Sequence, residues 1–167
     1  MKLRIALIVF AATLLPPVSK TAFSQPASPS WIAIVRDGWV ADWNLKDLNA
    51  LLSLYADNAV LSPSSGQRII GKDAIAAYFK EVLASGAGDL TVNNIDADQS
   101  GRLAYYSGTY KYTNKGGGTT LSGAGAVSRG GSRQVRGSFL IVLDQQPDGK
   151  WLIVQHISTE APAPPSQ

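Results

Sequence analysis

The sequence contains no cysteine, and its only histidine is His156. The absence of cysteine excludes a disulfide framework, a thiolate metal site and a cysteine nucleophile. A single histidine also excludes a zinc site built from two histidines of one chain. Residues 96–101 resemble the start of a calcium loop, but Ser107 occupies the position of the closing acidic ligand. We therefore expect neither a metal nor an organic cofactor.

Charge is also scarce, at 16% of the 167 residues, and the formal net charge is +3. Three of the 15 basic residues, Lys2, Arg4 and Lys20, lie within residues 1–24, which contain no acidic residue. Without this segment, 12 basic residues balance 12 acidic ones and the net charge is zero. Because nucleic-acid binding needs a persistent basic surface, no nucleic-acid partner is expected.

The longest apolar run, residues 5–15, is too short for a bilayer span, which needs about 20 residues. Lys2 and Arg4 precede this run, and residues 22–24 (AFS) offer small residues around a cleavage site. This pattern predicts a secretory signal peptide over residues 1–24. We therefore expect a secreted or periplasmic protein with no membrane span after cleavage. An uncleaved N-terminal anchor is the alternative.

The mature chain has a single folded body between two proline-rich segments. Residues 25–30 (QPASPS) form a linker, and residues 161–167 (APAPPSQ) form a tail that cannot continue a helix or strand. The body, residues 31–160, has the length of one domain. The hydrophobic content of 45% is sufficient for a packed core.

The hydrophobic periodicity changes near residue 88. Before it, apolar residues predict three helices, the first carrying Trp31, Val35, Trp39 and Trp43 at every fourth position. Asn44 and Asp47 resemble the cap of the second helix. After residue 88 the period is two, and strands are expected over 90–95, 103–113, 133–144 and 151–159, with a turn at 96–102. This order predicts an α+β fold with helices on one face of a curved antiparallel sheet.

Three stretches, 55–61 (YADNAVL), 71–79 (GKDAIAAYF) and 147–153 (PDGKWLI), resemble the nuclear transport factor 2-like superfamily. The resemblance is to its SnoaL-like and SgcJ/EcaC-like groups, which include domains of unknown function. It implies a cone-shaped barrel, in which three N-terminal helices close a strongly curved antiparallel sheet around a pocket. It also implies a homodimer formed through the outer face of the sheet.

The same resemblance allows a comparison with ketosteroid isomerases. Their general-base aspartate corresponds to Pro63, their oxyanion-hole tyrosine to Trp39 and their second, acidic donor to Phe139. Enolisation needs a base near the carbon acid and donors at the oxyanion. Since this chain has none of these groups at those positions, steroid isomerisation by that route is disfavoured.

The resemblance instead implies an aromatic pocket lined by Trp39, Tyr55, Phe79 and Phe139. His156 would point into it from the final strand, on the same face as Val154 and Ser158. Trp151, Ile153 and Ile157 would then face outward and form the dimer surface. The alternatives are that the four aromatic residues only pack the core, and that His156 is a core histidine bonded to the backbone or to Tyr55.

Three functions remain open. The chain is a secreted binder of a small apolar or aromatic molecule, an isomerase, hydratase or cyclase with His156 as acid/base, or a non-catalytic homo-oligomerisation module. A cavity below about 100 Å³ would favour the module, since ligand sites usually reach about 300 Å³.

The sheet region also carries an uneven charge distribution. Residues 116–131 are glycine-rich and predict a hairpin tip rather than a phosphate loop, because no helix follows. Residues 99–143 contain no acidic residue, which would suit an anionic ligand or partner. Alternatively, these basic side chains form a solvated face of the sheet, or they protect edge strands from aggregation. The six basic residues are Arg102, Lys111, Lys115, Arg129, Arg133 and Arg136.

Overall fold

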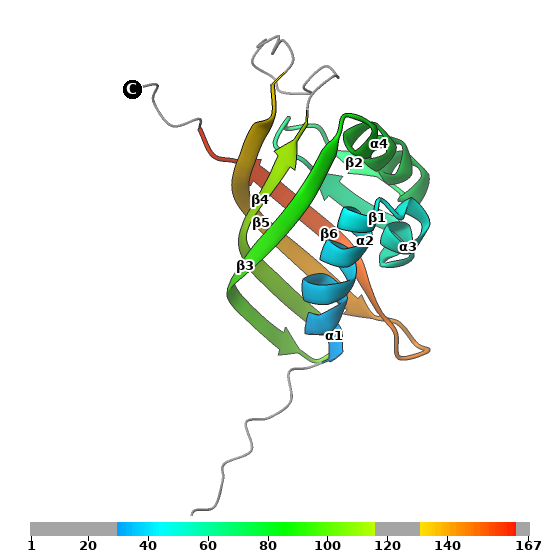
Figure 1. The fold of residues 1–167 in the computed structure, drawn as a ribbon. Coiled ribbons are helices and arrows are strands. Elements are labelled where there is room, and N and C mark those ends of the chain that lie inside the picture. Colours follow the sequence, from blue (N-terminus) through cyan, green and yellow to red (C-terminus); the bar gives the residue numbers. More distant parts are fainter. Residues whose placement is uncertain (1–29, 116–130, 163–167) are drawn as a thin grey trace, which may run out of the picture.

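The computed structural model describes residues 30–115 and 131–162 and has the expected α+β architecture. Helices cover one face of a curved, unclosed six-stranded sheet, and the core lies between the two layers (Figure 1). The predicted signal peptide, the linker up to residue 29, most of the glycine-rich segment and residues 163–167 lie outside the described residues. Within the described ranges, no helix has the length and apolar character needed to cross a membrane.

The helical elements are α1 (Ser30–Ala33), η1 (Ile34–Trp39), α2 (Val40–Leu45), α3 (Leu48–Ser53) and α4 (Lys72–Ala84). The strands are β1 (Tyr55–Ser62), β2 (Ile69–Ile70), β3 (Ala87–Ser100), β4 (Leu103–Asn114), β5 (Arg133–Gln145) and β6 (Trp151–Glu160). The sheet order is β2-β1-β6-β5-β4-β3. All neighbours are antiparallel except β1 and β6, which run parallel. The sheet therefore departs from the fully antiparallel arrangement that we expected.

The first helix contains a π-helical segment, η1, which links α1 to α2. An α-helix has 3.6 residues per turn, so a stripe spaced by four residues drifts by about 40° per step. The π-helical segment turns less per residue and offsets this drift. Trp31, Val35, Trp39 and Trp43 are consequently all buried on one side.

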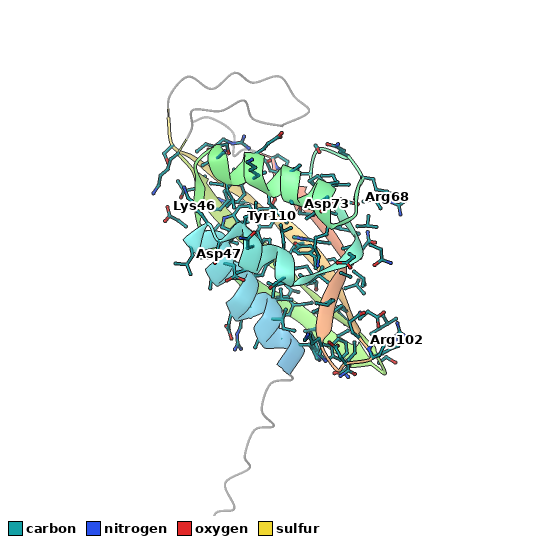
Figure 2. The ribbon with its side chains drawn as sticks, turned by 90° about the vertical axis from the view of Figure 1, so that its right-hand side faces the viewer. Lys46, Asp47, Arg68, Asp73, Arg102 and Tyr110 are labelled. Carbon is teal, nitrogen blue, oxygen red and sulfur yellow. The ribbon has the colours of Figure 1, made fainter. Side chains whose placement is uncertain are left out.

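The junction between α2 and α3 is tight, and Figure 2 marks Lys46 and Asp47 there. Lys46 adopts a left-handed conformation (φ 59°), and the Asp47 carboxylate accepts a hydrogen bond from the Ala50 backbone N–H at 2.9 Å. Asp47 is therefore the cap, and the expectation for Asn44 was wrong. The Asn44 amide instead bonds both backbone groups of Leu90, at 3.0 and 2.7 Å, and ties the helices to β3.

Two element boundaries also differ from those expected. Tyr55, predicted as the end of the second helix, is the first residue of β1. The expected turn at 96–102 is mostly strand, because β3 pairs with β4 as far as Ser100 and Leu103. Backbone pairing thus extends β3 through polar residues that show no hydrophobic alternation.

A β-bulge in β6 changes which residues face the core. Val142 pairs with Gln155 and Leu143 with Ile153, so Val154 is an extra residue. A bulge inserts one residue and reverses the alternation beyond it. Trp151 and Ile153 are therefore buried together with His156, and the prediction that they face outward was wrong. Ile157 alone of that set is exposed.

Close backbone approach in the curved sheet requires glycine at position 137. A Cβ there would overlap the Thr159 carbonyl oxygen and lie 2.7 Å from the Tyr110 ring. The Tyr110 hydroxyl donates a hydrogen bond to the same carbonyl at 3.1 Å. Gly137 therefore leaves room for Tyr110 to reach across β5 to β6.

We predict that Gly137→Ala lowers the free energy of unfolding by about 3 kcal/mol, because the methyl group forces the strands apart. Urea denaturation measures the change. Gly88→Ala is the matched control in a strand, since a Cβ at Gly88 meets nothing within 4 Å. Equal effects of the two variants would contradict this account.

Candidate functional site

A hydrogen-bonded chain of three buried side chains crosses the core. The Trp39 Nε1–H donates to the Tyr55 hydroxyl at 3.0 Å, and this hydroxyl lies 2.8 Å from Nδ1 of His156. The three residues come from η1, β1 and β6. The chain thus joins the helical layer to the middle of the sheet.

This arrangement sets the tautomer of His156. An indole N–H can only donate, so the Tyr55 oxygen accepts from Trp39. Within the described residues the buried Tyr55 hydroxyl has no acceptor other than Nδ1, so the tautomer that satisfies its proton is the one in which Nδ1 accepts and the imidazole proton resides on Nε2. Nε2–H has no hydrogen-bond partner in the described part of the chain. The imidazole borders a cavity.

Burial keeps both groups neutral. His156 is only 3% exposed, and desolvation lowers its pKa to about 4. Burial likewise raises the pKa of Tyr55, so its hydroxyl remains protonated. Near neutral pH, His156 is therefore an uncharged hydrogen-bond donor at Nε2 rather than a proton acceptor.

The cavity beside His156 has a volume of about 60 Å³. Of the predicted pocket residues, Trp39, Phe79, Phe139 and His156 line it. Tyr55 is not among the lining residues; it is fully buried and bonds the imidazole through Nδ1. Ser158 lines the cavity, as expected from its spacing to His156, whereas Val154 is displaced by the bulge.

The sequence reasoning missed a tyrosine cluster formed by Tyr78, Tyr110 and Tyr112. The Tyr110 and Tyr112 rings are nearly parallel at 14°, with centroids 6.1 Å apart. Burial raises the pKa of Tyr78 and of Tyr110 to about 12. Alternation of tyrosines along residues 106–112 could have revealed the β4 members, but nothing in the sequence places Tyr78 of α4 opposite them.

Trp43 also lines the cavity, and its indole N–H is buried. Its ring centroid lies 6.0 Å from that of Phe79, with the two rings edge-on, and 5.7 Å from that of Tyr112. Its Nε1–H is buried and has no hydrogen-bond partner in the described ranges. A buried donor without an acceptor costs folding free energy, and such groups usually have a functional or solvent explanation.

None of the cavity-lining residues is an Asp, Glu, Lys or Arg. Within the described ranges, no three His, Cys, Asp or Glu side chains gather as metal ligands. The site therefore provides neutral donors, hydroxyls and aromatic rings. It has no carboxylate beside His156 to act as a second acid or base.

The chain belongs to the SnoaL-like domain family, which residues 37–153 match. None of the curated proteins matches the chain. Among proteins of known structure, in contrast, nuclear transport factor 2-like proteins have the same fold as this chain. Three such structures are each less than 25% identical to this chain.

A ketosteroid isomerase-like protein from Erwinia carotovora atroseptica is 19% identical, with a TM-score of 0.64 over 80% of this chain and 94% of that one. A protein described as a calcium/calmodulin-dependent protein kinase II association domain, from Xanthomonas campestris, is 24% identical, with a TM-score of 0.64 over 82% and 91%. A nuclear transport factor 2-like superfamily protein from Salmonella enterica is 14% identical, with a TM-score of 0.61 over 79% and 88%. At these identities, the likeness establishes the fold alone.

We predict that the imidazole of His156 does not titrate between pH 8 and 5, because its pKa is near 4. Because the sequence has one histidine, its NMR signals are unambiguous. Nitrogen-15 shifts should report the Nε2–H tautomer throughout this range. A titration midpoint near 6.5 would contradict both burial and tautomer.

The depressed pKa also makes stability depend on pH. The unfolded chain binds a proton below about pH 6.5 and the folded chain only near pH 4, so stability is lost as the pH falls through this window. From pH 7 to 5 the expected loss is about 2 kcal/mol. His156→Asn retains an acceptor for Tyr55 but cannot bind the proton. Urea denaturation of this variant should show a free energy of unfolding that lacks this loss of about 2 kcal/mol between pH 7 and 5.

Proposed function

We propose that this domain binds a small, uncharged molecule whose apolar ring enters the aromatic cavity and whose carbonyl-type oxygen accepts from His156 Nε2–H. The unpartnered Nε2–H donor carries the proposal. Tyr55 and Trp39 hold the imidazole in the donor tautomer, so the group needs no rearrangement when a ligand arrives.

The charge of the lining supports an uncharged ligand. A carboxylate in this cavity would lose its hydration without meeting a cation, and burial of an unpaired charge is costly. An acceptor oxygen would instead satisfy the Nε2–H donor, which has no partner among the described residues.

The volume limits the size of the inserted group. About 60 Å³ provides room for about four water molecules and is smaller than the cavity of about 150 Å³ that holds benzene, so the aromatic side chains must shift to admit a single ring, and a large polycyclic molecule is excluded. On volume alone, the cavity falls below the 100 Å³ that separated a binder from an association module. The neutral polar groups favour a binder, because a core collapsed for association has no use for unsatisfied donors.

The alternative of an enzyme with His156 as acid/base receives less support. A base at Nε2 would require the proton to move to Nδ1. The Tyr55 hydroxyl would then lose its acceptor while still receiving the Trp39 N–H. Polarisation of a ligand carbonyl by the neutral imidazole is the chemistry that this geometry favours.

We predict that acetophenone binds the protein and that His156→Phe weakens this binding about tenfold, the effect of losing one hydrogen bond to a carbonyl. The matched ligand α-methylstyrene replaces the carbonyl oxygen with a methylene group. Its affinity should change less than twofold. Titration followed by the indole NMR signals measures both ligands.

Trp151→Phe serves as the control, since Trp151 is a buried tryptophan outside the cavity. It should leave both affinities unchanged. Absence of binding by either ligand at millimolar concentration would refute the ligand-binding proposal. Equal weakening of the two ligands by His156→Phe would refute the role of the Nε2–H donor.

The small cavity and the likeness to a kinase association domain favour a second candidate function, homo-oligomerisation. Leu140, Val142 and Ile157 lie on the sheet face opposite buried Phe139, Ile141 and His156, and Leu140 pairs directly with Ile157. We propose that this apolar strip, which we call the outer strip, contacts a second copy of the chain.

We predict that Ile157→Lys weakens dimer formation at least tenfold, because a charge would be buried in the contact. Sedimentation velocity of residues 25–167 measures the effect. Ile95→Lys on the edge strand β3 is the control, since Ile95 is also exposed. A wild-type chain that remains monomeric at high micromolar concentration would refute this second candidate.

We also propose that the protein acts outside the cytoplasm. The charged start, the short apolar run and the small residues at 22–24 support secretion into the periplasm or beyond. Mass spectrometry of the N-terminus from a periplasmic fraction tests this, with Gln25 as the expected first residue.

A further inference from the structure

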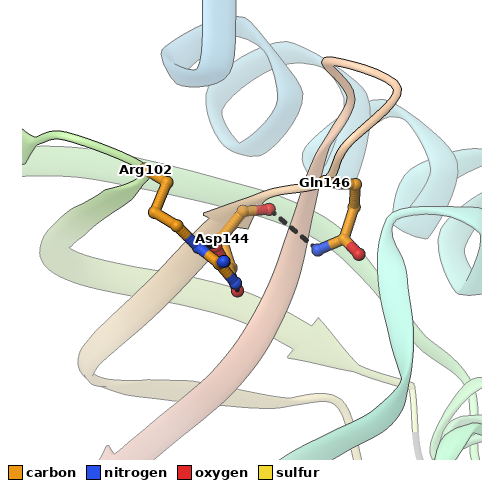
Figure 3. Close-up of polar contacts among 3 residues, drawn as sticks. All are labelled: Arg102, Asp144 and Gln146. Atoms are coloured by element: carbon orange, nitrogen blue, oxygen red, sulfur yellow. Dashed lines mark hydrogen bonds and ion pairs between the residues drawn. The ribbon is translucent and has the colours of Figure 1, made fainter.

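Three of the six basic residues in the acid-free stretch 99–143 have carboxylate partners. Arg102 binds Asp144 through two hydrogen bonds of 2.7 and 2.5 Å, and Figure 3 shows this pair. Lys115 pairs with Asp89 at 3.5 Å, and Arg133 pairs with Glu160. Arg129 lies outside the described residues.

Lys111 and Arg136 remain without a carboxylate partner in the described ranges. Among the described residues, the Arg136 side chain bonds only Gln134, from Nε to the amide oxygen at 2.9 Å. The two residues are direct partners across β4 and β5, and both are exposed. Like charges directly opposite each other on one sheet face destabilise the pair.

Protection of an edge does not explain this pair. Cations discourage aggregation on edge strands, but β4 and β5 lie inside the sheet, and its edges are β2 and β3. Two unpaired cations are thus held together at a cost in stability, away from any edge. This juxtaposition indicates binding of an anion.

The surroundings of the pair form an open groove of about 520 Å³. This volume lies within the usual range for small-molecule sites. Thr91 and Asn93 line it from β3, Thr109 from β4 and Ser138 from β5, and none of its lining residues is acidic. The groove therefore combines two cations with hydroxyl and amide groups that both donate and accept hydrogen bonds.

We propose that this groove binds a polyhydroxylated small molecule bearing a phosphate monoester, such as a sugar phosphate. The phosphate dianion neutralises Lys111 and Arg136, and the Arg136 guanidinium contacts two of its oxygens. Thr91, Asn93, Thr109 and Ser138 bind the hydroxyl groups of the ligand. This site lies on the exposed face of the sheet and is independent of the aromatic cavity.

Calorimetric titration with glucose 6-phosphate tests the proposal. We expect binding to the wild-type chain at low ionic strength, weaker binding near 0.15 M salt because of screening, and no binding of glucose. Glucose 6-sulfate, a monoanion, should bind more weakly than the phosphate. Lys111→Gln and Arg136→Gln should each weaken phosphate binding about tenfold.

Arg68→Gln is the matched control, because Arg68 is an exposed cation away from the groove (Figure 2). It should leave the affinity unchanged. Lys111→Gln should also raise the Tm of the unliganded protein, because it removes the like-charge pair. A fall in Tm would show that Lys111 supports the fold, and the proposal would be wrong.

Two further outcomes would overturn the proposal. One is equal affinity for glucose and glucose 6-phosphate, which would mean that the groove does not distinguish charge. The other is unchanged phosphate binding by the two cation variants. If those variants altered sedimentation instead, the cations would serve a contact between copies of the chain.

Discussion

The hydrogen-bonded chain from Trp39 through Tyr55 to His156 is the interaction on which the rest of the structure depends. Each of these polar groups is buried and therefore needs a partner, and each comes from a different element. Satisfying Trp39 and Tyr55 uses Nδ1 of the imidazole and leaves Nε2–H for the cavity. The same bonds that join helix to sheet therefore produce a neutral donor within an aromatic wall.

Two local features of the sheet place residues of the core and the site. The bulge at Val154 brings Trp151, Ile153 and His156 to one face, so the core and the site share a strand. Gly137 lets Tyr110 reach across to β6. Opposite the cavity, the same strands carry the outer strip and the Lys111–Arg136 pair, so one sheet supports proposed contacts on both faces.

Much of the fold could be predicted from the sequence, but less of the site. The tryptophan stripe, the strand periods and the stretches near residues 55, 71 and 147 predicted the α+β architecture and its family. Three features were not predictable in this way: the contact of Asn44 with β3 in place of a helix cap, the inward orientation of Trp151, and the absence of Tyr55 from the cavity wall. Each depends on a partner distant in sequence: Leu90, the β5 register and the bond to His156. The Tyr78 contact with the β4 tyrosines was missed for the same reason.

By itself, the sequence determined the order of helices and strands, the lack of thiol and multi-histidine chemistry, and the identity of the one residue that could titrate near neutrality. Those properties follow from residue type and local spacing. Only the tertiary structure decided the tautomer of His156, its depressed pKa, the cavity volume and which cations lack partners. These depend on burial and on atoms brought together from distant segments, and local periodicity carries no information about either.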